Sequence, residues 1–80
     1  MDKDILIKNI NLIHTTEMGI IRIKKNLFIN EDVVNYCKKV IINPMTNIYR
    51  KGKNYYCELN NIRLTINAYS YTIITAHIFK

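Results

Sequence analysis

The chain has 80 residues, with 12 Lys or Arg and 6 Asp or Glu, which gives a formal net charge of +6. Apolar residues make up 49% of it and Gly and Pro are rare, which excludes a disordered chain and predicts one small domain over residues 1–80. No apolar run approaches the roughly 18 residues of a membrane span, and the opening residues are not those of a signal peptide. We therefore expect a cytoplasmic protein without a membrane partner. Residues 41–80 hold five cations and one acid, Glu58, which favours a polyanionic or acidic partner.

Apolar residues recur at helical spacing in the first half of the chain, residues 1–43. The pattern predicts a first helix over about Lys3–Ile13 and a second over about Glu17–Asn26. Thr15 and Thr16 offer N-cap oxygens for the second helix. Gly19 weakens this helix, and we expect its small size to permit close packing.

A third helix is the clearest of the three in the pattern. It is predicted to begin after an N-cap at Asn30 and to stop at Asn43-Pro44. Cys37 lies on its apolar stripe, and the other cysteine, Cys57, lies in the second half of the chain. Because the spacing of the two fits no zinc site, we expect buried thiols and no bound metal.

The apolar residues alternate within residues 46–79, which predicts four short strands. These are Asn47–Lys51, Asn54–Leu59, Ile62–Ala68 and Tyr71–Ile78, with turns at Gly52 and at Asn60-Asn61. Turns this short make an antiparallel meander. The predicted fold is α+β, with two to three N-terminal helices packed on one face of a C-terminal four-stranded antiparallel sheet.

Strict alternation assigns one face of this sheet to the core and leaves the other open to solvent. In the last strand it turns these residues inward: Thr72, Ile74, Ala76 and Ile78. Ile73 is turned outward, and Tyr55 and Tyr56 point to opposite faces, with Tyr55 in the core. The open face is then predicted to gather Tyr56, Glu58, Arg63, Thr65, Asn67, Tyr71, Thr75 and His77.

The sequence has no glycine-rich phosphate loop, no HExxH or GxSxG motif and no cluster of acids, so an enzyme of this kind would work without metal or cofactor. Metal-free RNA cleavage needs a base, an acid and a cation at the phosphate. His77 and Glu58 are the candidates for proton transfer, and Arg63 is the candidate cation. The plain alternatives are an exposed histidine near the chain end and a cross-strand ion pair between Glu58 and Arg63. A second histidine, His14, is either a further catalytic candidate or a residue that ends the first helix.

The densest basic and aromatic stretch surrounds the turn at Gly52 and contains Arg50, Lys51 and Lys53. Cations contact phosphates and tyrosine rings stack on bases, so this stretch predicts a nucleic-acid contact. Tyr56 and Tyr71 on the predicted open face are the candidates for base stacking. A solubilising hairpin tip is the alternative.

Three segments resemble motifs of an uncharacterised family of short bacterial proteins: HTTEMG at 14–19, RKGKNYY at 50–56 and NAYSYTIITAH at 67–77. More loosely, the order of helices, basic hairpin and a final IITA strand at 73–76 is similar to the Barnase–EndoU–colicin–RelE-like ribonucleases. That second resemblance implies a metal-independent ribonuclease with its site on the sheet. The residues it implies are His14, Arg22, Lys51, Lys53, Tyr56, Arg63, Asn67, Ser70, Thr75 and His77.

The sequence leaves two functions open. The first is a small RNA-targeting effector, a metal-independent endoribonuclease toxin with a cognate antitoxin. The second is a non-enzymatic phage or mobile-element inhibitor of a host defence nucleoprotein such as a CRISPR effector. The strand edges also offer a route to a homodimer.

Overall fold

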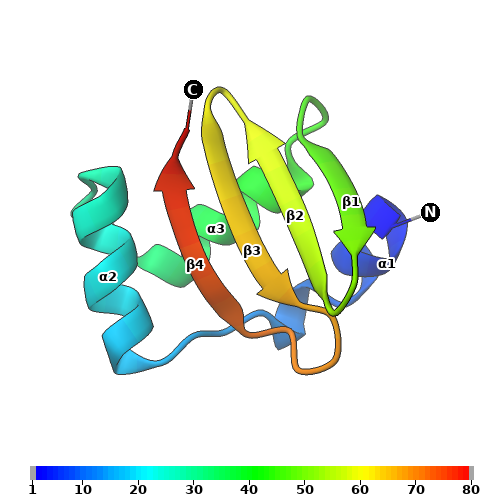
Figure 1. Cartoon of the computed structure of the whole chain (residues 1–80), viewed down its shortest axis with the longest axis horizontal. Coiled ribbons are helices and arrows are strands. Elements are labelled where there is room, and N and C mark those ends of the chain that lie inside the picture. The colour runs from blue at the N-terminus through cyan, green and yellow to red at the C-terminus, as the bar shows by residue number, and fades with distance from the viewer. Residues whose placement is uncertain (1, 80) are drawn as a thin grey trace.

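The computed structural model describes residues 2–79 and places all helices before the strands (Figure 1). The helical part comprises α1 (Asp2–Lys8), a short 3-10 turn η1 (Ile10–Leu12), α2 (Glu17–Leu27) and α3 (Val33–Ile42). The strands are β1 (Asn47–Lys51), β2 (Asn54–Leu59), β3 (Ile62–Asn67) and β4 (Ile73–Ile78). They form one sheet in the order β1-β2-β3-β4, with every neighbouring pair antiparallel. The predicted α+β class is confirmed.

Side-chain caps decide where α2 and α3 begin. The Thr16 hydroxyl accepts a hydrogen bond from the Gly19 N–H at 3.0 Å, so the predicted cap of α2 is confirmed. The predicted cap of α3 at Asn30 is wrong, because Asp32 takes that place and accepts from the Asn35 N–H at 2.9 Å. Both residues can cap a helix, but Asp32 directly precedes Val33, the first buried residue of the stripe.

The prediction of one continuous first helix over Lys3–Ile13 is also wrong. The α-helical bonding ends at Lys8, and the chain continues as η1 before Ile13 becomes extended. The break lies at Asn9, whose backbone leaves helical geometry at φ −104° and ψ 23° and whose N–H is shared between the Ile5 and Leu6 carbonyls, while its side-chain amide donates to the Ile5 carbonyl at 2.9 Å.

The two tight turns of the meander lie where the sequence predicts them. Asn60 and Asn61 both have positive φ, 48° and 70°, the left-handed pair that joins strands by a two-residue turn. Gly52 has a φ of 62° in the β1–β2 turn, a conformation that favours glycine. The registers of β1–β2 and β2–β3 follow directly from these turns.

The predicted faces at the start of β4 are wrong because the strand contains a bulge. Thr65 pairs with Thr75 but Ile66 pairs with Ile73, so Ile74 is an extra residue. The shift turns Ile73 into the core, where it is 1% exposed, and leaves Ile74 41% exposed. The strand also begins at Ile73 rather than at the predicted Tyr71, and β3 ends one residue before the predicted Ala68.

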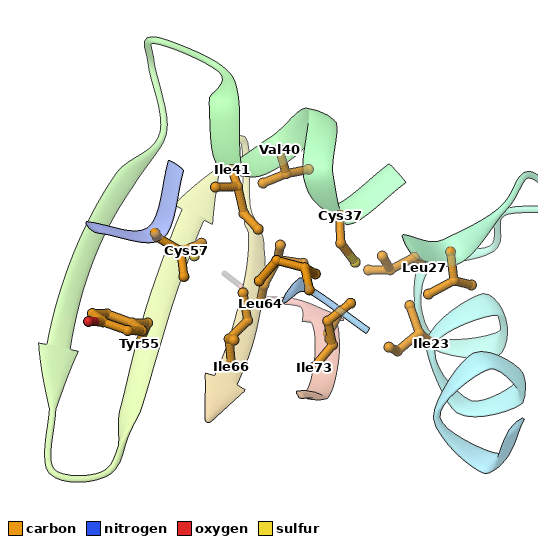
Figure 2. Close-up of a cluster of buried hydrophobic side chains, with 14 of the residues drawn as sticks. Ile23, Leu27, Cys37, Val40, Ile41, Tyr55, Cys57, Leu64, Ile66 and Ile73 are labelled. Atoms are coloured by element: carbon orange, nitrogen blue, oxygen red, sulfur yellow. The ribbon is translucent and has the colours of Figure 1, made fainter. Parts of the chain in front are cut away.

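The hydrophobic core lies between the helices and one face of the sheet (Figure 2). Helix α3 crosses behind the strands, α2 lies beside β4, and α1 lies beside β1 (Figure 1). Tyr55 points into this core, and both cysteines are fully buried free thiols, as predicted. The helices therefore lie to one side of the sheet, and its opposite face is open within residues 2–79.

Side chains and a linker segment cover parts of both sheet edges. On β1, the Arg50 N–H donates to Asp2 at 3.0 Å. On β4, Thr15 donates to the Ile73 carbonyl at 2.9 Å, Asn26 donates to the Ala76 carbonyl at 3.1 Å, and the Ile73 N–H bonds to the backbone of His14. A homodimer formed by strand pairing stays a prediction, and it would have to displace such bonds.

Candidate nucleic-acid interface on the open sheet face

The strand registers arrange the open face in three rows that run from β1 towards β4. The first row contains Asn47, Glu58, Arg63 and His77. The second row contains Tyr49, Tyr56, Thr65 and Thr75, and the third contains Lys51, Asn54 and Asn67. Most of the residues predicted for function therefore share one surface, which we call the sheet face and define by these three rows.

The first row brings together the three residues predicted for proton transfer and charge. Arg63 lies opposite Glu58 on one side and His77 on the other. Its Nε donates to Glu58 Oε2 at 2.9 Å, and its guanidinium lies 4.4 Å from the ring centroid of Phe79. The cross-strand ion pair is therefore confirmed, and Arg63 is held in place from two sides.

Glu58 has a second partner that the sequence did not identify. The Tyr49 hydroxyl donates to the same oxygen, Oε2, at 2.8 Å. The hydrogen bond to Glu58 is the main cause of a raised pKa for Tyr49, with desolvation adding to it. Oε2 of Glu58 therefore accepts hydrogen bonds from both Arg63 and Tyr49, which ties the carboxylate to the strands on either side of β2.

The second row is centred on a pair of stacked tyrosines. The ring centroids of Tyr49 and Tyr56 lie 5.5 Å apart with the planes inclined by 25°. Tyr49 begins the basic and aromatic stretch of the sequence but is not among the residues predicted for the site, although the two-residue turn at Gly52-Lys53 already pairs it with Tyr56. Thr75 lies on this row as predicted, whereas Thr65 is buried rather than open.

The cations around the β1–β2 turn differ in their surroundings. Lys51 and Lys53 are exposed, and within residues 2–79 neither ammonium group makes a hydrogen bond or an ion pair. Arg50 instead stacks over Tyr69 at 5.3 Å and donates to its hydroxyl at 3.1 Å. Arg50 thus joins the β1–β2 turn to the β3–β4 turn, and the two lysines are the cations available to a ligand.

His14 and Asn67 belong to a hydrogen-bonded network at the β3–β4 turn. His14 Nδ1 lies 2.8 Å from the Leu12 carbonyl, which can only accept, so Nδ1 carries the proton. Nε2 lies 3.1 Å from the Thr72 hydroxyl, which in turn lies 2.8 Å from the Ser70 hydroxyl. Asn67 Oδ1 accepts from the Ser70 N–H at 2.9 Å and closes the turn.

The two histidines lie at opposite ends of β4. His14 is bridged to Thr72, whereas His77 lies five residues further along, opposite Arg63. At about 3.3 Å per strand residue, the five-residue step from Thr72, beside which His14 lies, to His77 covers roughly 15 Å of backbone. The structure therefore separates His14 from the row that contains His77.

Two further predicted residues lie off the sheet face. Tyr71, predicted on the outside, is instead half-buried and packs against the core, and its φ of 59° lies at the turn before β4. Arg22 is exposed on α2, which lies beside β4 rather than over the strands (Figure 1).

The described part of the chain offers no grouped metal ligands. Among residues 2–79, no three His, Cys, Asp or Glu side chains come close enough to hold a metal ion. A hollow of about 260 Å³ lies against α3, and none of the residues predicted for function lines it. No helix in these residues has the length and apolar character needed to cross a bilayer.

The fold and this surface define a small α+β protein with a four-stranded meander, helices on one face and a polar, aromatic face on the other. The chain belongs to the family described as "Protein of unknown function (DUF3781)", which it matches over residues 7–77. The sequence resemblance to an uncharacterised family is confirmed in this form. No curated protein and no solved structure matches the chain.

Proposed function

We propose that the protein binds single-stranded RNA across the sheet face. The observation that carries this proposal is the stacked Tyr49–Tyr56 pair on a surface that the helices leave open. Tyrosine rings stack on bases with little regard to sequence, and exposed lysines attract phosphates. Lys51 and Lys53 lie at the end of the face next to this pair, and the net charge of +6 favours a polyanion.

Stacking can be tested with a fluorescently labelled 12-nucleotide single-stranded RNA and anisotropy titrations. Tyr56→Ala should weaken binding about 5- to 150-fold, since one stacked base contributes about 1–3 kcal/mol. Tyr56→Phe retains the ring and should bind like the wild type. Equal affinities for all three proteins, with folding verified by circular dichroism, would contradict stacking on this face.

The phosphate contacts can be tested through the salt dependence of the same titration. The double variant Lys51→Ala, Lys53→Ala should flatten the slope of log affinity against log salt by about 1.4, at about 0.7 per phosphate contact. The double variant Lys38→Ala, Lys39→Ala removes the same charge from α3 and is the matched control. If both doubles change the slope equally, binding reflects overall charge and the proposed surface is wrong.

RNA cleavage is a second candidate function, favoured by the order of the first row. Adjacent strands lie about 4.8 Å apart, so the backbones of Glu58 and His77 are separated by roughly 10 Å, with Arg63 between them. A phosphodiester seated on Arg63 would then have a carboxylate on one side and an imidazole on the other. These three side chains would supply the base, the acid and the cation that metal-free RNA cleavage needs.

Cleavage of total RNA in EDTA tests this second candidate. Fragments should appear with the wild type and disappear with His77→Ala or Arg63→Ala. His14→Ala should still cleave, because His14 lies at the other end of β4. Intact RNA at micromolar wild-type protein would exclude the ribonuclease and leave RNA binding as the function. If the wild type neither cleaves nor binds RNA, the non-enzymatic inhibitor of a host nucleoprotein would be favoured.

A further inference from the structure

The outward side of α2 has an apolar stripe that the core does not use. The helix buries Gly19, Ile23 and Leu27 on its inner side. On the opposite side Met18 is 66% exposed, Ile21 is 63% exposed and Phe28, which ends the helix, is 86% exposed. Exposed apolar side chains gathered on one helix face mark interaction surfaces more often than isolated ones do.

The spacing of this stripe is that of a helix-pairing seam. Met18, Ile21 and Lys25 follow one another within α2 at intervals of three and four residues, which are the a, d and a positions of a heptad repeat, and Phe28 follows three residues later at the helix end. In the same register Arg22 falls at an e position, and a second cation, Lys24, falls at g. Side chains at e and g select the charge of a partner helix.

Phe28 carries two costs that glycine would avoid while keeping the helix-end hydrogen bonds from the N–H groups of residues 28 and 29 to the Lys24 carbonyl. Its backbone lies in the left-handed region, at φ 57° and ψ 43°, where glycine is the usual residue at a helix end. Its ring is also the most exposed of the large apolar side chains in residues 2–79. A glycine at this position would remove both costs, so the ring points to a contact outside the chain.

We propose that the α2 stripe, defined as Met18, Ile21, Arg22, Lys25 and Phe28, docks an acidic amphipathic helix of a protein partner. The partner helix presents apolar residues at its own a and d positions and Glu or Asp at e and g. Within α2 the cations are Arg22, Lys24 and Lys25, and the single acid is Glu17 at its first turn. Charge complementarity therefore selects an acidic partner.

The arrangement of the stripe distinguishes this occupant from two others. A second copy of the chain would place cations against cations, which disfavours self-pairing. Helices that lie on an anionic membrane segregate their cations to the polar face, whereas Arg22 and Lys25 stand within the apolar stripe. An acidic partner helix tolerates cations within the apolar stripe because its own acids would lie opposite them.

The test uses a synthetic 21-residue peptide with Leu at a and d and Glu at e and g, titrated into the full chain by calorimetry. The matched peptide has Lys in place of every Glu. We expect the acidic peptide to bind and the basic peptide not to bind. Phe28→Gly should lower the affinity about fivefold or more, the size of a modest interface hot spot, without loss of stability. Equal binding of the two peptides, or unchanged binding by Phe28→Gly, would overturn the proposal.

Charge-reversal variants provide the second part of the binding test. Arg22→Glu should weaken the acidic peptide and gain affinity for the basic one, whereas Lys39→Glu on α3 makes the same charge change and should do neither. Phosphatidylglycerol vesicles that bind the wild type but not Phe28→Gly, in the absence of peptide binding, would assign the stripe to a lipid surface instead. The RNA affinity of Phe28→Gly should equal that of the wild type. The test of the α2 stripe is therefore independent of the proposal that the sheet face binds RNA.

Discussion

Gly19 offers the sharpest test of how α2 is held against β4. A methyl group at this position would overlap Oγ1 of Thr15. That hydroxyl donates to the Ile73 carbonyl at 2.9 Å and joins the residues before α2 to the edge of β4. The expectation from the sequence, that the small size of Gly19 serves close packing, is thus confirmed. We predict that Gly19→Ala destabilises the protein although alanine is the better helix former.

The magnitude follows from opposing contributions. Alanine in place of glycine stabilises a helix by up to about 1 kcal/mol. Against this, the Thr15 hydroxyl must turn away from Ile73, which costs about 0.5–1.5 kcal/mol, and crowding adds about 1–3 kcal/mol. The net loss is about 0.5–3.5 kcal/mol, and a loss of about 2 kcal/mol in the middle of that range lowers the Tm of a domain this size by roughly 8–16 °C. Thermal and urea unfolding followed by circular dichroism measure both quantities.

A double-variant cycle isolates the clash. Thr15→Ala alone should cost about 1 kcal/mol through the lost hydrogen bond. In that background the overlapping oxygen is gone, so Gly19→Ala should now stabilise by up to about 1 kcal/mol. A sign change between the two backgrounds is the expected result. Stabilisation by Gly19→Ala in the wild type, or an equal cost in both backgrounds, would refute the reasoning.

Four further predictions concern the core, a helix end and the sheet face. Burial raises the pKa of the Cys37 and Cys57 thiols from 9.0 to about 12, so a disulfide reagent at pH 8 should label neither until the protein unfolds. Because the folded pKa is the higher one, the stability that these thiols contribute is complete below pH 9 and should fall as the pH rises towards 12, and urea unfolding across that range would measure it. Phe28→Gly should be about 0.5–1 kcal/mol more stable than Phe28→Ala by urea unfolding, since only alanine keeps a Cβ in the left-handed region, and equal stabilities would argue against the strain. Glu58→Gln removes the carboxylate and should lower the pKa of Tyr49 towards its ordinary value, which an ultraviolet pH titration measures. An unchanged titration would show that the hydrogen bond to Glu58 is not the cause of the raised pKa.

Short-range signals determined much of the fold. The change from helical spacing to alternation predicted the order of helices and strands, and the Asn60-Asn61 and Gly52 turns predicted the bounds of β1 and β2. A two-residue turn also sets the register, so the Glu58–Arg63 pair could be predicted from the chain itself. Such features depend on residues close in sequence, where local sterics and turn geometry decide the outcome.

The tertiary structure alone decided the rest of the candidate site. The bulge at Ile74 exchanged the predicted faces of Ile73 and Ile74. Together with the loop before β4, it set the register that pairs His77 with Arg63. His14 lies beside Thr72, 58 positions away in sequence, because the segment before α2 runs along the edge of β4. The periodicity of the sequence does not specify that contact. It forms because α2 packs against the sheet and buries Ile23 and Leu27 in the core. Packing over long sequence separations therefore divided the predicted catalytic residues between the two ends of β4.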